Sequence, residues 1–215
     1  MNQSILNKIN AFFSEFKVIE YAKGEIITFA GEEPQGVMLL QAGVVEQYDI
    51  TPEGNRITVN LFKPNTFFPM SWAINKTPNN YFYAALTDVK LRRADPDKTV
   101  AFLQANSDVL FDLLSRVYKG TDALLQRLVV TASGIASSRL VFELLIEAYR
   151  FGEEIEASKW LIKTKQLSLA ERSGLARETV NRELHKLEAD ELISLSKGGI
   201  ELNVQKLEQK LDIHI

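Results

Sequence analysis

The chain has 215 residues, of which 46% are hydrophobic and 25% are charged, and its formal net charge is −3 at pH 7. This length is enough for one large or two small domains with real cores, and we expect two. No run approaches about 18 uninterrupted apolar residues, and the first residues lack a charged start followed by an apolar core, so we expect a cytoplasmic protein without membrane contact. The absence of cysteine excludes disulfides, thiolate metal sites and cysteine-held iron–sulfur clusters.

Residues 18–95 have the composition of a β domain, because β-branched and aromatic residues fill the stretch between regularly spaced turn signals. Such spacing predicts an all-β barrel or jelly roll. Residues 56–61 alternate between apolar and polar types, which predicts a strand with Ile57, Val59 and Leu61 on one face. The turn signals are Lys23-Gly24, Gly31, Gln35-Gly36, Ala42-Gly43 and the segment from Pro52 to Asn55.

Residues 107–135 return to helical spacing. Apolar side chains recur there at steps of four and three, which is the heptad pattern of a coiled-coil helix. Residues 131–134, Thr-Ala-Ser-Gly, then supply the small and flexible residues expected of a hinge. The heptad stripe consists of Leu110, Leu114, Val117, Thr121, Leu124 and Leu128.

The last 80 residues begin with a predicted helix at residues 137–149 and a short strand at residues 160–162. Two short helical patterns follow within residues 167–188, hinged at Gly174. Small residues on the inner face of the first helix let the two helices cross closely around a tight turn. This spacing predicts a helix-turn-helix.

The second helix of this pair exposes Arg177, Glu178 and Arg182 along one edge, while its apolar residues turn inward. A guanidinium can pair bidentately with guanine O6 and N7, and a carboxylate can accept from cytosine N4, so this trio suits the reading of base edges. Thr179 and Lys165 lie where a hydroxyl and an ammonium could hold phosphates. The alternative is an ordinary amphipathic helix pair with a solvated, charged face.

Residues 192–202 contain two short β-prone runs around Lys197-Gly198-Gly199, a hairpin turn signal that completes a winged helix. The segment 173–184, SGLARETVNREL, resembles the recognition element of the Crp/Fnr family of bacterial transcription regulators, in the subtype with Arg-Glu-x-x-x-Arg. The front of the chain is similar to the cyclic-nucleotide-binding domain of that family, in residues 21–33, in Gln41-Ala-Gly43 and in Gly54. The resemblance covers about residues 15 to 203. Past the wing, Asn203 is a good N-cap for a last helix over residues 204–211.

This resemblance implies that Arg177, Glu178 and Arg182 read base edges and that Thr179 contacts the DNA backbone. It also implies that the helix at residues 107–135 forms a coiled-coil homodimer with two reading helices about one DNA turn apart, roughly 34 Å. The operator is then an inverted repeat, with a TGTGA-like core in each half-site. The alternative is that the heptad stripe packs only against the β domain of its own chain. Further candidate contacts to the backbone are Lys165, His185, Lys186 and Lys197.

One departure from the family pattern concerns the nucleotide. Family members that bind a cyclic nucleotide carry a Gly-Glu pair, a short helix and then Arg-Ser or Arg-Thr, whereas this chain has Pro69 and Met70 and no arginine or lysine between Lys76 and Lys90. A buried phosphate without a cationic partner costs several kcal/mol. We therefore expect a degenerate cassette that recognises neither cyclic AMP nor cyclic GMP.

Aromatic residues take the place of the cassette. They could line a pocket for an apolar or aromatic effector, with tyrosine hydroxyls to orient it, or they could simply fill the vacated space. The sequence is compatible with both interpretations, and the effector is unknown or absent. The residues concerned are Phe67, Phe68, Met70, Trp72, Tyr81, Phe82 and Tyr83.

The chain lacks the residue sets of an enzyme or a haem protein. The two histidines, His185 and His214, are not placed to be axial ligands in the β domain. There is no cysteine nucleophile, no histidine cluster, no phosphate-cradling glycine loop and no Gly-x-Ser-x-Gly. The acidic pairs Glu32-Glu33 and Glu153-Glu154 lie in turn-like segments and are expected to be solvated. We expect neither catalysis nor a cofactor.

Overall charge argues against DNA binding, because residues 136–215 contain 12 Lys and Arg against 14 Asp and Glu. Position matters more than the sum, so we expect local attraction with a strong salt dependence. The basic residues expected around the reading face are Lys163, Lys165, Arg172, Arg177, Arg182, Lys186 and Lys197.

Taken together, these patterns predict an α+β protein with an N-terminal β jelly roll (1–106), a long dimerisation helix and hinge (107–135) and a C-terminal winged helix-turn-helix (136–215). Its predicted function is that of a sequence-specific transcription regulator which binds a palindromic operator as a homodimer. Double-stranded DNA and a second copy of the chain are the expected partners, with RNA polymerase as a further candidate. The alternative is a module that binds an effector or a protein and whose winged helix does not bind DNA.

Overall fold

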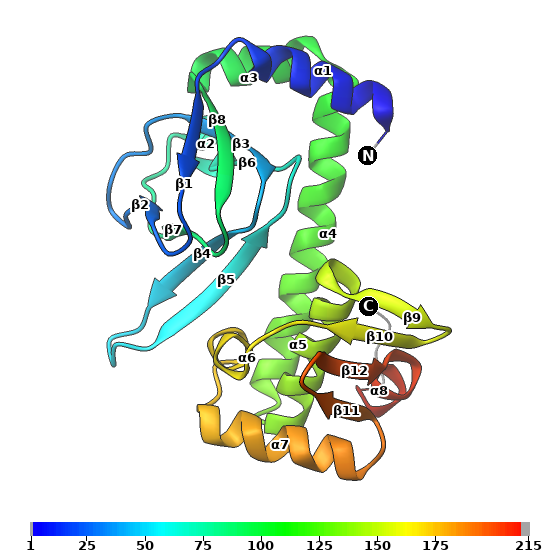
Figure 1. The fold of residues 1–215 in the computed structure, drawn as a ribbon. Coiled ribbons are helices and arrows are strands. Elements are labelled where there is room, and N and C mark those ends of the chain that lie inside the picture. The colour runs from blue at the N-terminus through cyan, green and yellow to red at the C-terminus, as the bar shows by residue number, and fades with distance from the viewer. Residues whose placement is uncertain (1, 212–215) are drawn as a thin grey trace. The chain divides into compact units, whose positions relative to one another are not determined.

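The structure, a computed structural model, describes residues 2–211 (Figure 1). The chain divides into two compact units, residues 1–118 and residues 119–215, and the division falls within one long helix, α4 (Ser107–Ala132). Separate hydrophobic clusters form the cores of the two units. No helix among residues 2–211 is long and apolar enough to cross a membrane. His214 lies outside the described residues.

Eight strands of the first unit form two antiparallel, four-stranded sheets with the orders β1-β8-β3-β6 and β2-β7-β4-β5. Both sheets contribute side chains to one hydrophobic cluster, so they pack face to face. This arrangement confirms the predicted β fold. The strands are β1 (Val18–Tyr21), β2 (Ile26–Thr28), β3 (Val37–Ala42), β4 (Val45–Ile50), β5 (Arg56–Phe62), β6 (Phe67–Phe68), β7 (Phe82–Ala85) and β8 (Val89–Ala94).

The predicted alternation in β5 is wrong in detail. Its buried residues are Thr58 and Leu61, whereas Ile57 and Val59 are only half-buried. The cause is a β-bulge, because successive residues of β4 pair with Asn60 and then with Thr58, and the skipped residue shifts the phase of the strand.

Three helices of the first unit were not predicted: α1 (Gln3–Ser14), α2 (Met70–Asn75) and α3 (Pro96–Ala105). The caps of α1 and α3 are local, since the side chain of Asn2 accepts from Ser4 N–H and that of Asp95 accepts from Lys98 N–H. The two helices, together with the start of α4, cover a second hydrophobic cluster that includes Ile9, Phe13, Leu103 and Val109.

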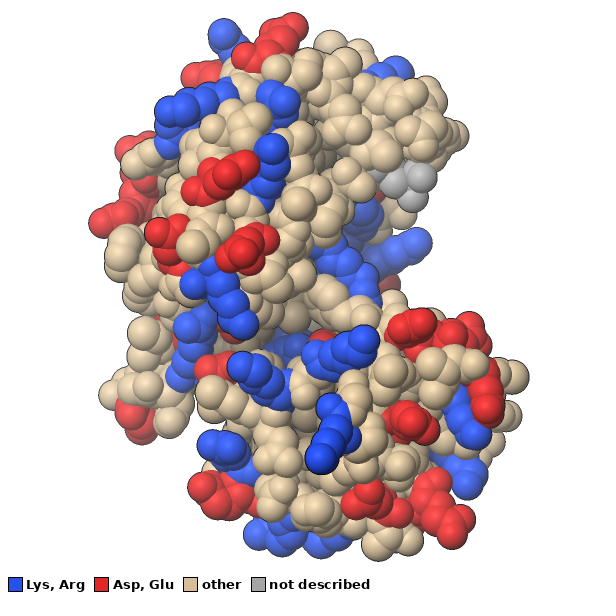
Figure 2. Space-filling view, viewed as in Figure 1, with Lys and Arg blue, Asp and Glu red and all other residues tan. Residues whose placement is uncertain are grey.

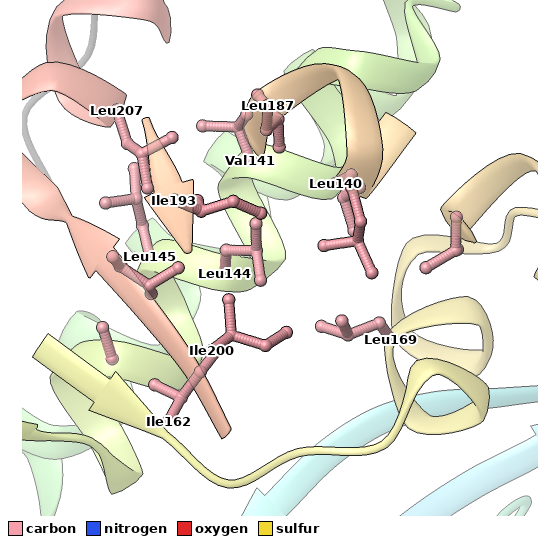
Figure 3. Close-up of a cluster of buried hydrophobic side chains, with 14 of the residues drawn as sticks. Leu140, Val141, Leu144, Leu145, Ile162, Leu169, Leu187, Ile193, Ile200 and Leu207 are labelled. Carbon is pink, nitrogen blue, oxygen red and sulfur yellow. The ribbon is translucent and has the colours of Figure 1, made fainter. Parts of the chain in front are cut away.

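The second unit contains the predicted winged helix-turn-helix. Its four strands form an antiparallel sheet of order β11-β12-β10-β9, and its helices pack around one hydrophobic cluster, which Figure 3 shows. Strand β9 is a correction, because Glu153-Glu154 was expected in a turn and instead forms a strand, although a fully exposed one. The elements are α5 (Ala136–Phe151), β9 (Glu153–Glu156), β10 (Lys159–Ile162), α6 (Gln166–Ser173), α7 (Arg177–Ala189), β11 (Ile193–Ser196), β12 (Gly199–Asn203) and α8 (Val204–Leu211).

Local signals fix the ends of two of these helices. The side chain of Asn203 accepts a hydrogen bond of 3.1 Å from Lys206 N–H, which confirms the predicted N-cap of α8. Gly174 ends α6 with φ of 62°, a left-handed conformation in which a side chain would be strained. The turn between α6 and α7 therefore favours glycine at this position.

Helix α4 leaves its predicted heptad stripe exposed. The five apolar members are 40–64% exposed and Thr121 is also exposed. Leu110, Leu114 and Val117 belong to the same unit as the β sheets, so their exposure argues against a stripe that packs only on its own β domain. Apolar neighbours on the same helix widen this surface; they are Phe111, Tyr118, Leu125 and Val129.

Candidate nucleic-acid interface

An arginine of α5 hydrogen-bonds to the C-terminal end of α6, where the turn of the helix pair α6–α7 begins. Arg139 donates from Nε to Ser173 O and from Nη2 to Gly174 O, each at 2.9 Å. These carbonyls belong to the C-terminal turn of α6, where the backbone lacks helical partners. Arg139, which the sequence did not single out, therefore fixes the turn from which α7 starts.

Helix α7 buries one face and exposes the other. Val180, Leu184 and Leu187 are at most 1% exposed and belong to the core cluster. Arg177 and Glu178 lie on the first turn, are exposed, and form no hydrogen bond or ion pair with the rest of the described chain. Both side chains are therefore available to a ligand.

Arg182, one turn further along α7, is also exposed but has a neighbour. Its Nε lies 3.5 Å from Oε1 of Glu183, a carboxylate that is itself buried. Lys186 Nζ donates to the same oxygen at 2.8 Å, and this hydrogen bond holds the pKa of Glu183 below its ordinary value. Glu183 thus contacts both Arg182 and Lys186 and keeps the two cations close together on α7. The sequence alone did not indicate this role.

Two of the predicted backbone contacts meet in a hollow of about 500 Å³ between the start of α6, α7 and the wing. Lys163 and Lys165 line it from the segment after β10, and Lys197 lines it from the β11–β12 turn. Three ammonium groups around one hollow suit a phosphate backbone. Gln166, at the same hollow, donates from Nε2 to Asn181 Oδ1 at 3.1 Å and so links the start of α6 to the exposed side of α7.

The other predicted backbone contacts lie on α7 itself. Thr179 is half-buried on its first turn, and His185 and Lys186 are exposed near its C-terminal end. His185 Nδ1 lies 3.5 Å from Glu188 Oε2. These three side chains do not join the lysines that line the hollow.

The placement of Arg172 corrects a prediction. It was expected among the basic residues around the reading face, but its side chain is buried and points to α5, where Nη1 donates to Glu147 Oε2 at 2.7 Å. A charge in a helical pattern was assumed to be solvated. Here the acidic partners on α5, which lie 25 to 29 residues earlier, override that expectation.

The candidate effector residues do not form one group. Phe67, Met70 and Trp72 pack in or against the cluster under α1 and α3, whereas Phe68 and Tyr83 belong to the cluster between the two sheets. Tyr81 is exposed, and Phe82 stacks on Tyr48 with ring centroids 5.0 Å apart. This distribution favours the interpretation in which the aromatic rings fill the interior of the β domain and do not line an effector pocket.

Asn79 occupies the end of the degenerate cassette. Its side chain is buried and donates to the carbonyls of Phe29 and Tyr81 at 3.0 and 2.9 Å. It also accepts from Tyr81 N–H at 3.2 Å. The hydrogen-bonding capacity of this side chain is thus taken up by the backbone. Within residues 2–211, no three His, Asp or Glu side chains are grouped so as to hold a metal ion.

Charge is mixed over the surface. Figure 2 shows basic and acidic side chains interspersed on the visible face, without one large field of either sign. Attraction of an anionic ligand therefore depends on local groups such as the lysines of the hollow.

The sequence matches two protein families. Residues 18–106 match the cyclic nucleotide-binding domain and residues 138–210 match the Crp-like helix-turn-helix domain. The chain is 26% identical over 193 residues to the HTH-type transcriptional regulator ArcR of Staphylococcus haemolyticus, covering 89% of this chain and 83% of that protein. It is 29% identical over 187 residues to the global nitrogen regulator of Nostoc sp., covering 84% and 82%.

Solved structures share the fold. A transcriptional regulator of the CRP/FNR family from Thermus thermophilus superimposes with a TM-score of 0.71 at 22% identity, over 92% of this chain and 99% of that one. FixK2 from Bradyrhizobium japonicum gives a TM-score of 0.73 at 20% identity, over 93% and 98%. At these identities the likeness concerns the fold alone.

Proposed function

Because the chain belongs to the Crp/Fnr family of DNA-binding transcription regulators, we propose that it reads an inverted-repeat operator as a homodimer. The observation that carries this proposal is the face of α7. Arg177, Glu178 and Arg182 are exposed side by side on a helix whose opposite face is buried. The relatives are transcription regulators, not enzymes, and the proposed activity is binding alone.

In this proposal α7 enters the major groove. Arg177 and Arg182 pair with guanines and Glu178 accepts from a cytosine, which gives each half-site a TGTGA-like core. Since Arg177 and Glu178 have no partner among the described residues, DNA competes with no internal contact for them. Arg182 exchanges only a weak, exposed contact with Glu183 for a base.

The phosphate backbone follows the hollow between α6 and the wing. Lys165 and Lys197 are the predicted contacts there, and the shared hollow adds Lys163. Thr179, His185 and Lys186 would meet the backbone along α7. These contacts position the protein and supply its salt dependence, but they carry no sequence information.

A second copy of the chain covers the apolar surface of α4 in this proposal. Its side chains recur at heptad spacing, and their exposure of 40–73% leaves a row of large apolar groups in water in the single chain. A two-fold dimer through α4 presents two α7 helices and therefore requires a two-fold symmetric operator.

The β domain, by contrast, is proposed not to answer to cyclic AMP or cyclic GMP. Support comes from Pro69 and Met70 at the Gly-Glu positions, from Asn79 with its side chain committed to backbone groups, and from the division of the aromatic residues between two clusters. The effector, if the protein has one, is of another kind. RNA polymerase is proposed as a protein partner on family membership alone.

The test is selection of bound sequences from random duplex DNA, without added ligand, followed by affinity measurements on the selected operator. An inverted repeat is the expected product. Arg182→Ala should then cost about 1–3 kcal/mol on the operator and relax one base position, whereas Lys165→Ala should weaken operator and random DNA alike. Failure to enrich any motif, also in the presence of a metabolite extract, would favour a module whose winged helix binds protein. Equal losses on both DNAs for Arg182→Ala would refute its role as a base reader.

A further inference from the structure

Three charged side chains are buried in the second unit, and a fourth, that of Arg127, is partly exposed beside them. Glu143 and Glu147 come from α5, Arg172 from α6 and Arg127 from the C-terminal half of α4. Glu143 is 1% exposed, Arg172 7% and Glu147 8%. Carboxylates and guanidinium groups are rarely buried this far unless they hold one another in place.

Glu143 is the junction of this cluster. Arg127 donates to it as a fork, from Nε to Oε1 at 2.7 Å and from Nη2 to Oε2 at 3.1 Å. Arg172 Nε lies 3.8 Å from Oε2 on its other side, and Arg172 Nη1 donates to Glu147. Glu143 of α5 is therefore hydrogen-bonded to α4 and in ionic contact with α6, and Glu147 supplies the hydrogen bond between α5 and α6. A bidentate fork fixes orientation as well as distance, because it is planar.

Further contacts connect this cluster to the start of α7, the proposed recognition helix. Arg172, the second-last residue of α6, hydrogen-bonds to Glu147 of α5, and Arg139 of α5 donates to the carbonyls of Ser173 and Gly174 at the end of α6. From Gly174 the chain enters α7 after two residues. Arginine contacts thus link the end of α4, through α5, to the turn from which α7 starts.

Arg127 lies between Leu124 and Leu128, two members of the heptad stripe. In a dimer formed through that stripe, the contact from Arg127 to Glu143 connects the winged helix-turn-helix of each chain to the helix at the dimer axis. We propose that Arg127 and Glu143 are positioning residues that set the separation between half-sites which the dimer accepts. This inference rests on the proposed function, because it requires a dimer that reads two half-sites.

The expected consequence is specific to spacing. One base pair more or less moves a half-site by roughly 3.4 Å and rotates it about the DNA axis. A reading unit fastened rigidly to α4 cannot follow this movement, whereas a loosened one can, so loosening should relax the spacing requirement and leave contacts within a half-site intact. A cluster that merely stabilises the fold would affect all DNAs equally.

The experiment compares three duplexes that carry the selected inverted repeat with its own spacing, with one base pair added and with one removed, and a fourth that carries a single half-site. The proteins are the wild-type dimer, Arg127→Gln and Glu143→Gln. Lys119→Gln is the matched control, since Lys119 is an exposed cation on the same helix. Arg127→Lys, which keeps the charge but not the fork, guards against a folding defect in the stronger variants.

The preference for the correct spacing should fall by about tenfold in Arg127→Gln and Glu143→Gln, because each variant removes the fork between α4 and α5. The spacing preference of Arg127→Lys should lie between that of these two variants and that of wild type. The affinity of every variant for the single half-site should stay within about twofold of the wild-type affinity. An unchanged spacing preference in folded Arg127→Lys and Arg127→Gln, or equal losses on all four duplexes, would overturn the proposal. If wild type selects no inverted repeat, the proposed function itself has failed.

Discussion

Removal of the Arg172 guanidinium should destabilise the second unit strongly, because this side chain is buried and paired with acids of α5. Arg172→Met keeps a side chain of similar length but leaves Glu147 without the cation now 2.7 Å away, and leaves Glu143 with Arg127 alone. Breaking a buried ion pair from one side costs about 3–5 kcal/mol. Because Glu143 keeps its fork from Arg127, we expect a loss near the lower end, about 3 kcal/mol in the free energy of unfolding.

Urea unfolding at pH 7 and fixed protein concentration measures this loss. Trp160 packs against the core of the second unit, so in a Trp72→Phe background its fluorescence reports on that unit. Arg177→Met, an exposed arginine of α7, serves as the control and should stay within about 0.5 kcal/mol of the parent.

A double-mutant cycle with Glu147→Gln separates the ion pair from simple packing. If the unpaired carboxylate causes the loss, Arg172→Met should cost at least about 1 kcal/mol less in the Glu147→Gln background. A loss below about 1 kcal/mol in the single variant, or additive losses in the double variant, would refute this account of the cluster.

Three further predictions concern the dimer, the buried carboxyl and a helix cap. Leu128→Asp places a charge in the exposed apolar surface of α4 and should convert the dimer to a monomer in sedimentation; a persistent dimer would contradict the role given to that surface. Burial raises the pKa of Glu143 although Arg127 and Arg172 face it from α4 and α6, with Glu147 and Arg150 on α5 also near. The folded protein therefore takes up this proton at a higher pH than the unfolded chain does. The resulting contribution to stability is complete below the pKa of Glu143 in the unfolded chain, and it is lost as the pH rises through the pKa of Glu143 in the folded protein. The stability deficit of Glu143→Gln against wild type should accordingly be larger at pH 5 than at pH 7, and a pH-independent deficit would count against the raised pKa. Asn203→Ala should lower the unfolding free energy by about 1 kcal/mol through loss of the cap on α8, whereas Asn203→Asp should not, both measured in urea.

Local signals account for the parts of the fold that could be read from the sequence. The turn at Gly174, the cap at Asn203 and the alternation of buried and exposed residues on α7 each depend on a few neighbouring residues. Helix α3 carried a signal of the same kind, because Asp95 caps it and Pro96 stands at its first position. Helix α3 was nevertheless not predicted, because the pattern of strands before it is the stronger signal in this part of the sequence.

The remaining features depend on partners distant in the sequence. The bulge in β5 arises from its pairing with β4, and β9 is a strand because it pairs with β10 despite its acidic, exposed residues. The buried position of Arg172 depends on Glu143 and Glu147. Periodicity cannot distinguish such a residue from a solvated arginine, since both recur on a helix at the same spacing.

These contacts also resolve the apparent conflict between an acidic C-terminal region and DNA binding. Glu143 and Glu147 enter the charge count, yet they are buried and face arginines, so they contribute little field outside the protein. Three further acids lie on β9, one edge of the sheet, whereas the wing strand β11 forms the opposite edge. The lysines of the hollow belong to the wing and to the segment before α6. Because exposed charges are screened over about 8 Å at physiological salt, the acids of β9 oppose binding far less than the sum of charges suggests.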